Sequence, residues 1–259
     1  MSSVHTAIAP PSKWLAWMEG QRACAELSAL SVTSPFLQLA PRGDGHPVLV
    51  LPGFVTTDVS TWALRRYLSS LGYDVHAWEL GRNIGPKSIG ARGERLERRL
   101  EEIRAETGRK ASLVGWSLGG IMARELARSQ PDAVRQVITL GSPFTGNPHA
   151  TNVSKLYEQL SGEKVDDPRL LAKRARPPPV PSTAIFSKTD GIVAWRNCME
   201  PAGELTDNIE VRGSHFGLVV NPAVLFAVAD RLAQPERGWA PFARTGWRAA
   251  VYPFSGQLH

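Results

Sequence analysis

Short apolar runs that alternate with helical patterns constrain this chain more than any other feature. The run Pro47-Val48-Leu49-Val50-Leu51 is apolar throughout, as expected for a strand buried on both faces of a parallel sheet. Further strands are predicted at residues 74–80, 111–116, 134–140, 183–186 and 209–211. This alternation predicts an α/β fold with a mostly parallel, doubly wound sheet and helices on both of its faces.

Helices are predicted between these strands and at the N-terminus, at residues 12–30, 59–71, 90–107, 118–129 and 222–232. The pattern is clearest in residues 90–107, where Leu96, Leu100 and Ile103 recur at i, i+4 and i+7. Since crossover connections are right-handed, every loop from a strand into a helix opens at the same edge of the sheet. We therefore expect the functional site at the carboxyl edge of the strands.

The motif Gly115-Trp116-Ser117-Leu118-Gly119 lies at one of these strand-to-helix junctions. The pattern G-x-S-x-G is short and arises by chance, but here it follows an apolar strand and opens a helix, as a nucleophile elbow requires. Such a sharp turn strains the serine backbone and exposes its hydroxyl above the sheet. Gly115 and Gly119 are required because a side chain at either position would collide with the neighbouring strand or helix. Ser117 is the predicted nucleophile.

A serine nucleophile needs an adjacent base, and His215 is the best-placed histidine. It lies in Gly213-Ser214-His215-Phe216-Gly217, after the last predicted strand and before the last helix, so this loop can fold over the catalytic edge. His46 precedes the first clear strand, and His76 lies inside a strand. These two positions are at the wrong end of the sheet or buried.

The acid that orients the histidine is predicted at Asp190, directly after the strand at residues 183–186. It would hold the imidazole in the productive tautomer and stabilise the imidazolium. Asp190-Gly191 is also a common turn dipeptide, so a role in the turn alone remains an alternative. Asp207 and the pair Asp166-Asp167 are the alternative acids.

Two backbone N–H groups are expected to form an oxyanion hole. We assign them to Leu118, immediately after the nucleophile, and to Phe54, in the segment Leu51-Pro52-Gly53-Phe54 that ends the first apolar strand. The alternative for Pro52-Gly53 is a simple turn. Phe54, Trp116 and Leu118 surround the nucleophile with apolar side chains, and Trp116 is predicted to line the substrate pocket.

The order Ser117, Asp190, His215 with an upstream Pro-Gly-Phe resembles the α/β-hydrolase superfamily, and within it bacterial lipases and esterases. The similar blocks occur in the expected order and extend over residues 47–232. Many such lipases carry His-Gly where this chain has Pro52-Gly53. The N-terminal helix and the aromatic tail lie outside the resemblance.

The resemblance and the residues predict serine-dependent hydrolysis of a carboxylic ester through an acyl-enzyme on Ser117. An acyltransferase would use the same triad, with an alcohol or an amine in place of water. A non-catalytic binding protein with this fold is a further alternative, although such a protein has no reason to keep all three side chains. No metal or organic cofactor is predicted, because the histidines are scattered and no G-x-G-x-x-G follows a strand.

The charge and composition of the chain limit the kinds of partner that it is expected to bind. The 259-residue chain carries a formal charge of +6, without a stacking-aromatic or zinc pattern that would indicate nucleic-acid binding. Peripheral contact with an anionic membrane surface and ordinary solvated charge are the alternatives. Cys24 and Cys198 are far apart in sequence, and we expect free thiols. The sequence has neither a signal-peptide pattern nor a continuous apolar span, which favours a cytoplasmic location.

Two segments interrupt the single α/β-hydrolase domain predicted for residues 1–259, besides the helical N-terminal segment 1–40. Residues 145–181 form a long insertion at the catalytic edge and are predicted to be a cap or lid, with a structural crossover as the alternative. Lys173, Arg174 and Arg176 of this insertion are expected to face solvent or an anionic interface. The tail at residues 236–259 is rich in aromatic residues, expected to pack over the domain or to contact a partner.

Overall fold

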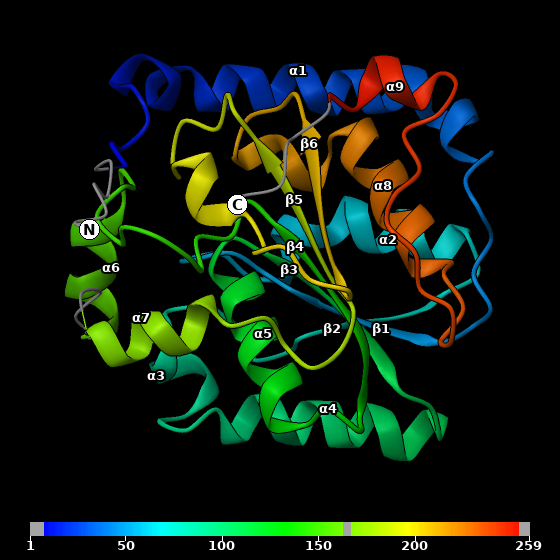
Figure 1. Ribbon diagram of the computed structural model, residues 1–259, viewed down its shortest axis with the longest axis horizontal. Helices are drawn as coiled ribbons and strands as arrows, with labels where there is room; N and C mark the ends of the chain where they lie inside the picture. Colours follow the sequence, from blue (N-terminus) through cyan, green and yellow to red (C-terminus); the bar gives the residue numbers. More distant parts are fainter. Residues whose placement is uncertain (1–7, 163–166, 254–259) are drawn as a thin grey trace.

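A six-stranded sheet with the order β2-β1-β3-β4-β5-β6 runs through the centre of the protein (Figure 1). The computed structural model describes residues 8–162 and 167–253, and every strand pairing within them is parallel. The strands are β1 (Pro47–Leu51), β2 (Asp74–Ala77), β3 (Ala111–Trp116), β4 (Val134–Leu140), β5 (Ser182–Ser187) and β6 (Thr206–Val211). The prediction of a parallel, doubly wound α/β sheet is therefore confirmed.

Helices cover both faces of this sheet, and Figure 1 shows α1 and α4 on opposite sides of it. The α-helices are α1 (Lys13–Leu37), α2 (Trp62–Ser70), α3 (Pro86–Ile89), α4 (Glu94–Thr107), α5 (Leu118–Ser129), α6 (Ser154–Ser161), α7 (Pro168–Ala175), α8 (Pro222–Leu232) and α9 (Arg248–Val251). Short 3-10 helices are η1 (Asp58–Thr61), η2 (Trp195–Cys198) and η3 (Phe216–Val219). No helix in these ranges is both long and apolar enough to cross a bilayer.

The side chains of β1 alternate between the two helical layers that cover the sheet. Val48 and Val50 pack with α2 and α8, whereas Leu49 and Leu51 pack with α4 and α5. This is the period of two expected for a strand, because successive side chains point to opposite faces. All five residues of β1 are buried, which explains why the run is apolar throughout.

The position of β1 in the sheet determines where a site can form. The chain passes from β1 outward to β2 and then returns across β1 to β3, so the strand order reverses between β1 and β3. At their carboxyl ends these two strands are in register, with Leu51 opposite Gly115. The loops that leave β1 and β3 therefore open side by side at the switch point, where ligands bind in sheets of this kind.

Several predicted boundaries differ from the structure for local reasons. The helix expected from residue 90 begins only at Glu94, because Gly90 and Gly93 have φ angles of 91° and 84° that break the helical path. Strand β2 ends at Ala77 rather than at residue 80, since the next two backbone N–H groups turn to the Asp58 carboxylate. Helix α1 continues past residue 30 to Leu37.

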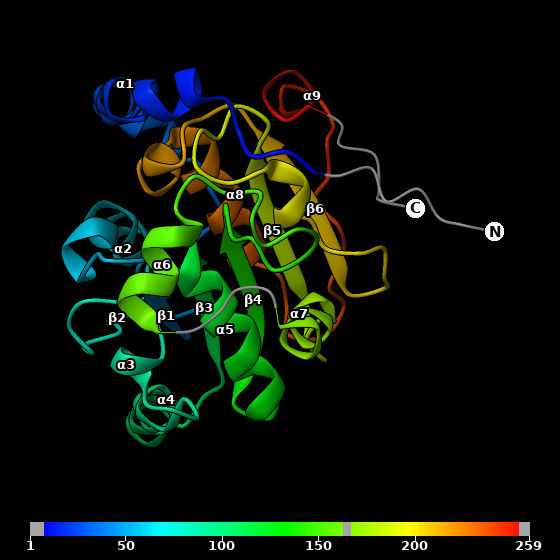
Figure 2. The same ribbon diagram turned by 90° about the vertical axis from the view of Figure 1, so that its left-hand side faces the viewer.

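The insertion between β4 and β5 contains α6 and α7, and α7 packs against α5 (Figure 2). Its return to the sheet is anchored by Arg124 of α5, which is fully buried and ion-paired with buried Glu200. Arg124 also donates hydrogen bonds to the carbonyls of Arg174 and Arg176, at 3.3 and 3.0 Å. The return arm is thereby held on the body of the sheet.

The aromatic tail divides into buried and exposed residues. Phe242 and Tyr252 are buried and pack edge to face, with ring centroids 4.7 Å apart. Trp247 lies against Phe226 of α8, yet more than half of its surface is exposed. Phe254 lies outside the described residues. The described aromatic residues of the tail thus pack partly over the domain and leave one tryptophan at the surface.

Candidate active site

Ser117 lies at the turn between β3 and α5, with φ and ψ angles of 53° and −121°. A non-glycine residue with a positive φ angle costs free energy, and the surrounding structure must hold it in place. Here the Ser117 N–H donates to the Leu140 carbonyl at 2.8 Å, and a Cβ on Gly119 would come within 2.5 Å of the Leu51 carbonyl oxygen. A Cβ on Gly115 would collide with the backbone of α5. The elbow geometry predicted from the motif is present.

Asp190 and His215 are in direct contact at the same edge of the sheet. Oδ2 of Asp190 lies 2.6 Å from Nδ1 of His215, and both side chains are buried. The other carboxylate oxygen, Oδ1, accepts the N–H groups of Ile192 and Val193 at 2.8 Å each. Asp190 therefore closes its own turn and also contacts the imidazole, so the turn accounts for only one of its two carboxylate oxygens.

Ser117 is not hydrogen-bonded to His215 in this structure, although the His215 loop lies beside the end of β3. Nε1 of Trp116 donates to the His215 carbonyl at 3.1 Å, and the two rings are 5.8 Å apart. Catalytic hydrogen bonds are often long in a free enzyme and tighten only in the substrate complex. The contact of Trp116 with His215 brings the loop of the base next to the residue that precedes the nucleophile.

Charge around His215 changes its basicity. Burial alone would lower the pKa of His215, but the negative charge of Asp190, the hydrogen bond that the imidazole donates to that carboxylate and the charge of Glu19 outweigh it. The pKa of His215 is therefore raised above its ordinary value. A base of this kind accepts a proton more readily, and the adjacent carboxylate stabilises the imidazolium that results.

The two predicted oxyanion donors lie on neighbouring loops at the switch point. Leu118 is the first residue of α5, so its N–H has no partner within the helix and lies at the positive end of the helix dipole. The loop that carries Phe54 packs on the elbow, because a Cβ on Gly53 would come within 2.8 Å of the Trp116 ring. The Phe54 loop, which follows β1, is thus packed against the end of β3, where Leu118 follows Ser117.

Asn83 holds the Phe54 loop, and the sequence analysis did not find it. Its Nδ2 donates to the Pro52 carbonyl at 2.8 Å, and its backbone exchanges hydrogen bonds with Val55 and Thr56 at 2.7 and 2.8 Å. The side chain is fully buried, and Val55 beside it has a φ angle of 55°. A buried asparagine that follows a strand could have indicated a structural polar role, but no motif links it to the loop.

A cavity of about 80 Å³ opens beside Ser117. Phe54, Leu118 and Ile121 line it from the body of the sheet. The insertion supplies most of the rest of its wall, with Pro143 and Val193 from outside it; the insertion residues are Thr145, Pro148, Thr151, Val153, Ser154, Tyr157, Leu171 and Arg174. Tyr157 packs on Phe54 with ring centroids 5.3 Å apart, so the insertion covers the catalytic edge.

Two predictions about this cavity need correction. Trp116 does not line it, because side chains alternate along β3 and the Trp116 ring points to the opposite layer, that of α2 and α8. Arg174 was expected to face away from the pocket, but it is half-buried and lines the cavity. Lys173 and Arg176 are exposed as expected, and Lys173 pairs with Glu125 at 2.7 Å.

The alternative acids and histidines lie away from Ser117. Asp207 is at the amino end of β6, where it accepts the Phe242 N–H at 2.7 Å. Asp167 caps α7, and Asp166 lies outside the described residues. His46 is buried at the amino end of β1, where it contacts Asp44 and the Ser112 hydroxyl.

The two cysteines of the chain differ in their exposure. Cys24 is exposed on α1, Cys198 is buried, and both are free thiols. Burial and the charge of Asp190 raise the pKa of Cys198 well above its usual range, which makes it a poor nucleophile. Within residues 8–162 and 167–253, no group of three or more His, Cys, Asp and Glu side chains is arranged to hold a metal ion.

Comparison with known proteins identifies lipases and esterases among the relatives of this chain. A triacylglycerol lipase of Pseudarthrobacter phenanthrenivorans is 31% identical over 120 residues, which cover 44% of this chain and 38% of the lipase. A pimeloyl-[acyl-carrier protein] methyl ester esterase of Aliivibrio fischeri (strain MJ11) is 27% identical over 101 residues, 39% of this chain and 38% of the esterase. The matched segment spans well under half of either relative.

Solved structures show the same fold at lower sequence identity. Lipase B of Aspergillus fumigatus has a TM-score of 0.57 and 18% identity, over 73% of this chain and 52% of the lipase. Bacillus licheniformis lipase BlEst2 has a TM-score of 0.54 and 18% identity, over 73% of this chain and 92% of that structure. The sequence profile described as "Alpha/beta hydrolase family" matches residues 48–258. Since this match runs from β1 through every strand of the sheet, the chain belongs to the alpha/beta hydrolase family.

Proposed function

We propose that this protein is a serine-dependent carboxylic ester hydrolase, with Ser117 as nucleophile, His215 as general base and Asp190 as the acid that orients it. The observation that carries the proposal is the buried 2.6 Å contact between Asp190 and His215 at the edge where Ser117 forms a strained elbow. Structural ion pairs are common in proteins, but a buried pair beside an elbow serine has a direct catalytic use.

The reaction follows from these three side chains. His215 takes the proton of the Ser117 hydroxyl as Oγ attacks the ester carbonyl carbon, and the N–H groups of Leu118 and Phe54 stabilise the oxyanion. The C–O bond to the alcohol then breaks, and His215 returns the proton to the leaving oxygen. Water attacks the acyl-enzyme in the same way, which releases the acid and restores Ser117.

The cavity supports an apolar acyl group as substrate. Its wall is mostly aliphatic and aromatic, with Arg174 as the cationic residue among those that line it. The names of the relatives, a triacylglycerol lipase and a methyl ester esterase, are consistent with an ester of a fatty or substituted acyl chain. An acyltransferase would use the same residues, and analysis of the products with and without added alcohol separates the two activities.

The insertion at residues 145–181 is proposed to act as a lid that sets acyl-chain preference. Leu171 and Tyr157 lie in the cavity wall, whereas Leu160 of α6 is at the surface. We expect Leu171→Trp to shift the preference among p-nitrophenyl esters toward shorter acyl chains and Leu171→Ala to shift it toward longer ones. Leu160→Ala is the matched control, and an unchanged chain-length profile in both Leu171 variants would argue that the insertion is only a connector.

Peripheral contact with an anionic membrane surface is part of the proposal. The chain carries a net charge of +6, and apolar side chains are exposed along α1 and α9: Trp14, Trp17, Leu27, Val32, Phe36, Trp247 and Val251. Aromatic residues favour the interface between water and lipid. We expect Trp14→Ser/Trp17→Ser to weaken binding to phosphatidylglycerol-containing vesicles, with exposed Trp62→Ser as control. Equal binding by both variants would count against a membrane role for α1.

Replacement of the nucleophile tests the catalytic proposal. Ser117→Ala should lower turnover of p-nitrophenyl butyrate by on the order of a millionfold, because the three residues act as a unit. It should also abolish labelling by a fluorophosphonate probe and leave the thermal unfolding temperature close to that of the wild type. A folded variant that retains a tenth of the wild-type activity would overturn the assignment of Ser117.

A further inference from the structure

Helix α1 is inverted in its polarity. An ordinary surface helix buries apolar residues and exposes charged ones. In α1 the apolar Trp14 and Trp17 are each 66% exposed, whereas the charged Glu19 is only 1% exposed. Arg22 and Glu26 follow at the spacing of one helix face, and both are partly buried. The charged side of α1 therefore faces the protein.

Glu19 bridges the two loops that carry Asp190 and His215. Oε1 of Glu19 accepts the N–H of Gly191 at 2.8 Å, and Oε2 accepts the N–H of Phe216 at 3.0 Å. Gly191 directly follows Asp190, and Phe216 directly follows His215. One buried carboxylate thus holds the residue after the acid and the residue after the base.

Arg22 and Glu26 hold the residues that precede Asp190 and His215 in the sequence. Arg22 donates to the carbonyl and the hydroxyl of Thr189, the residue before Asp190, at 2.7 and 2.9 Å. Oε1 of Glu26 accepts the N–H of Ser214, the residue before His215, at 2.7 Å. Together with Glu19, these side chains hold the neighbours on both sides of Asp190 and of His215. We call Glu19, Arg22 and Glu26 the α1 clamp.

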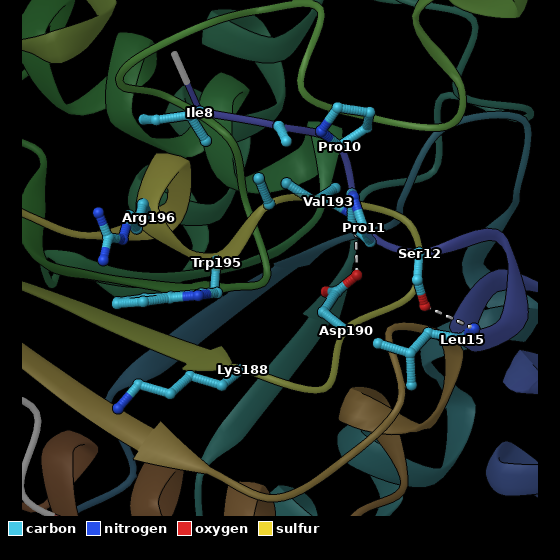
Figure 3. A pocket seen from close by; sticks show the side chains of 12 residues that line it. Ile8, Pro10, Pro11, Ser12, Leu15, Lys188, Asp190, Val193, Trp195 and Arg196 are labelled. Atoms are coloured by element: carbon cyan, nitrogen blue, oxygen red, sulfur yellow. Dashed lines mark hydrogen bonds between the residues drawn. The ribbon is translucent and has the colours of Figure 1, made fainter. Parts of the chain in front are cut away.

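The two loops are shaped for this close approach. A Cβ on Gly191 would lie 2.5 Å from the Leu15 backbone, so only glycine lets the helix come this near. Figure 3 shows the chain passing Asp190 at Pro11 and Ser12, directly before α1 begins at Lys13. On the other loop, a Cβ on Gly217 would collide with the Glu26 carboxylate.

Burial of Glu19 requires an explanation beyond stability. A carboxylate loses much solvation free energy when it is buried, and an apolar side chain would dock a helix at lower cost. Arg22 lies 3.7 Å away and offsets part of this cost, and the two backbone N–H groups offset more. The hydrogen bonds of Glu19 fix the positions of the two loops relative to each other, in addition to packing α1 on the domain.

We propose that Glu19 is a positioning residue, through which α1 sets the geometry of Asp190 and His215. The inference rests on the proposed catalytic roles of these two residues. Glu19 acts through its hydrogen bonds to the backbone of both loops, and its negative charge favours the imidazolium form of His215. The charged groups that surround His215 are Asp190 from its own loop and Glu19 from α1, with Arg22 and Glu26 one contact farther away.

The test compares Glu19→Gln with the wild type. A glutamine keeps one acceptor oxygen, but its amide nitrogen faces a second N–H donor and cannot accept from it. The charge is also lost. We expect kcat to fall roughly 10- to 100-fold with KM nearly unchanged, because a displacement of catalytic groups lowers turnover and leaves the acyl cavity intact. The acidic limb of kcat/KM against pH should move to lower pH, and the NMR titration of the His215 imidazole should move with it.

Matched variants separate positioning from a general loss of charge. Glu101→Gln removes an exposed carboxylate from α4, on the other side of the sheet, and should leave kcat and the acidic limb unchanged. Arg22→Gln, at a more exposed position, should lower kcat several-fold and serves if Glu19→Gln does not fold. If kcat and the His215 titration in the folded clamp variants match those of Glu101→Gln, the proposal is overturned. If Ser117→Ala is active, the proposed function fails instead, and the NMR titration still tests the clamp.

Discussion

Replacement of Asp190 by asparagine changes one atom of the side chain, and its consequence can be derived from the contacts of both oxygens. Oδ1 of Asp190 accepts the N–H groups of Ile192 and Val193 at 2.8 Å. These two donors require an oxygen, so the asparagine must place its carbonyl there. Its amide nitrogen then faces Nδ1 of His215, which lies 2.6 Å from the carboxylate in the wild type.

Two donors cannot share that contact, so His215 must carry its proton on Nε2 instead of Nδ1. In this tautomer Nε2 cannot accept the proton of Ser117. We expect kcat to fall by about 10⁴-fold, as when the acid of a catalytic triad is replaced by its amide, which corresponds to about 5.5 kcal/mol of transition-state stabilisation. The turn should stay folded, because both of its N–H groups keep their acceptor.

Hydrolysis of p-nitrophenyl butyrate, followed with thermal unfolding, measures this effect. Asp207→Asn is the matched control, since Asp207 lies at the amino end of β6 and contacts the tail at Phe242. It should reduce activity by no more than a few-fold. If Asp207→Asn loses more activity than Asp190→Asn, the acid has been assigned to the wrong residue and the tautomer argument fails.

Three further predictions follow from other contacts. Because the pKa of His215 is raised above 6.5, kcat/KM should increase with pH through an apparent pKa above 6.5. Thermal melts should show that the stability gained from His215, relative to His215→Gln, is full below pH 6.5 and is lost as the pH rises through the raised pKa. Asn83→Ala should lower kcat roughly tenfold or more with little change in KM, because the Phe54 loop loses its buried anchor, and steady-state kinetics on one ester checks this. Arg124→Met should lower the free energy of unfolding, measured in urea, by about 3–5 kcal/mol, because it leaves the Glu200 carboxylate buried without its cationic partner; Arg124→Met/Glu200→Leu should recover most of this loss.

The elbow and the sheet were predictable because their signals are local. An apolar strand, a small-residue turn and an amphipathic helix follow one another within residues 111–129, and each constrains the others. Asp190 and His215 could be assigned because parallel topology brings every strand end to one edge. The sequence analysis thus predicted which loops meet, without any knowledge of their distances.

Side-chain direction at Trp116 and Arg174 was not predictable in the same way. Trp116 adjoins the nucleophile in sequence, but the alternation of β3 turns its ring toward α8 and the His215 loop. Arg174 is part of a basic run, and such runs usually face solvent. The orientation of Arg174 depends on how α7 is held, and Arg124 of α5 holds it. Arg124 is too far from α7 in sequence for a local pattern to indicate this contact.

The role of α1 escaped prediction because its contacts join distant parts of the chain. Glu19 reaches residues 172 and 197 positions later in sequence. The helical spacing of Glu19, Arg22 and Glu26 was nevertheless visible in the sequence, as were the nearby tryptophans Trp14 and Trp17. The sequence analysis predicted a helix here, but it did not predict which of its faces is buried.

Hydrogen-bond requirements of the catalytic loops decide which face of α1 is buried. The N–H groups of Gly191, Ser214 and Phe216 donate to carboxylates of α1, and a buried N–H without an acceptor is costly. An apolar helix face laid on these loops would leave all three unpaired, whereas Glu19 and Glu26 accept all three. The face with the carboxylates must therefore turn inward, and the tryptophans are left outside. The position of Asp190 and His215 and the exposed apolar surface of α1 are two consequences of the same requirement.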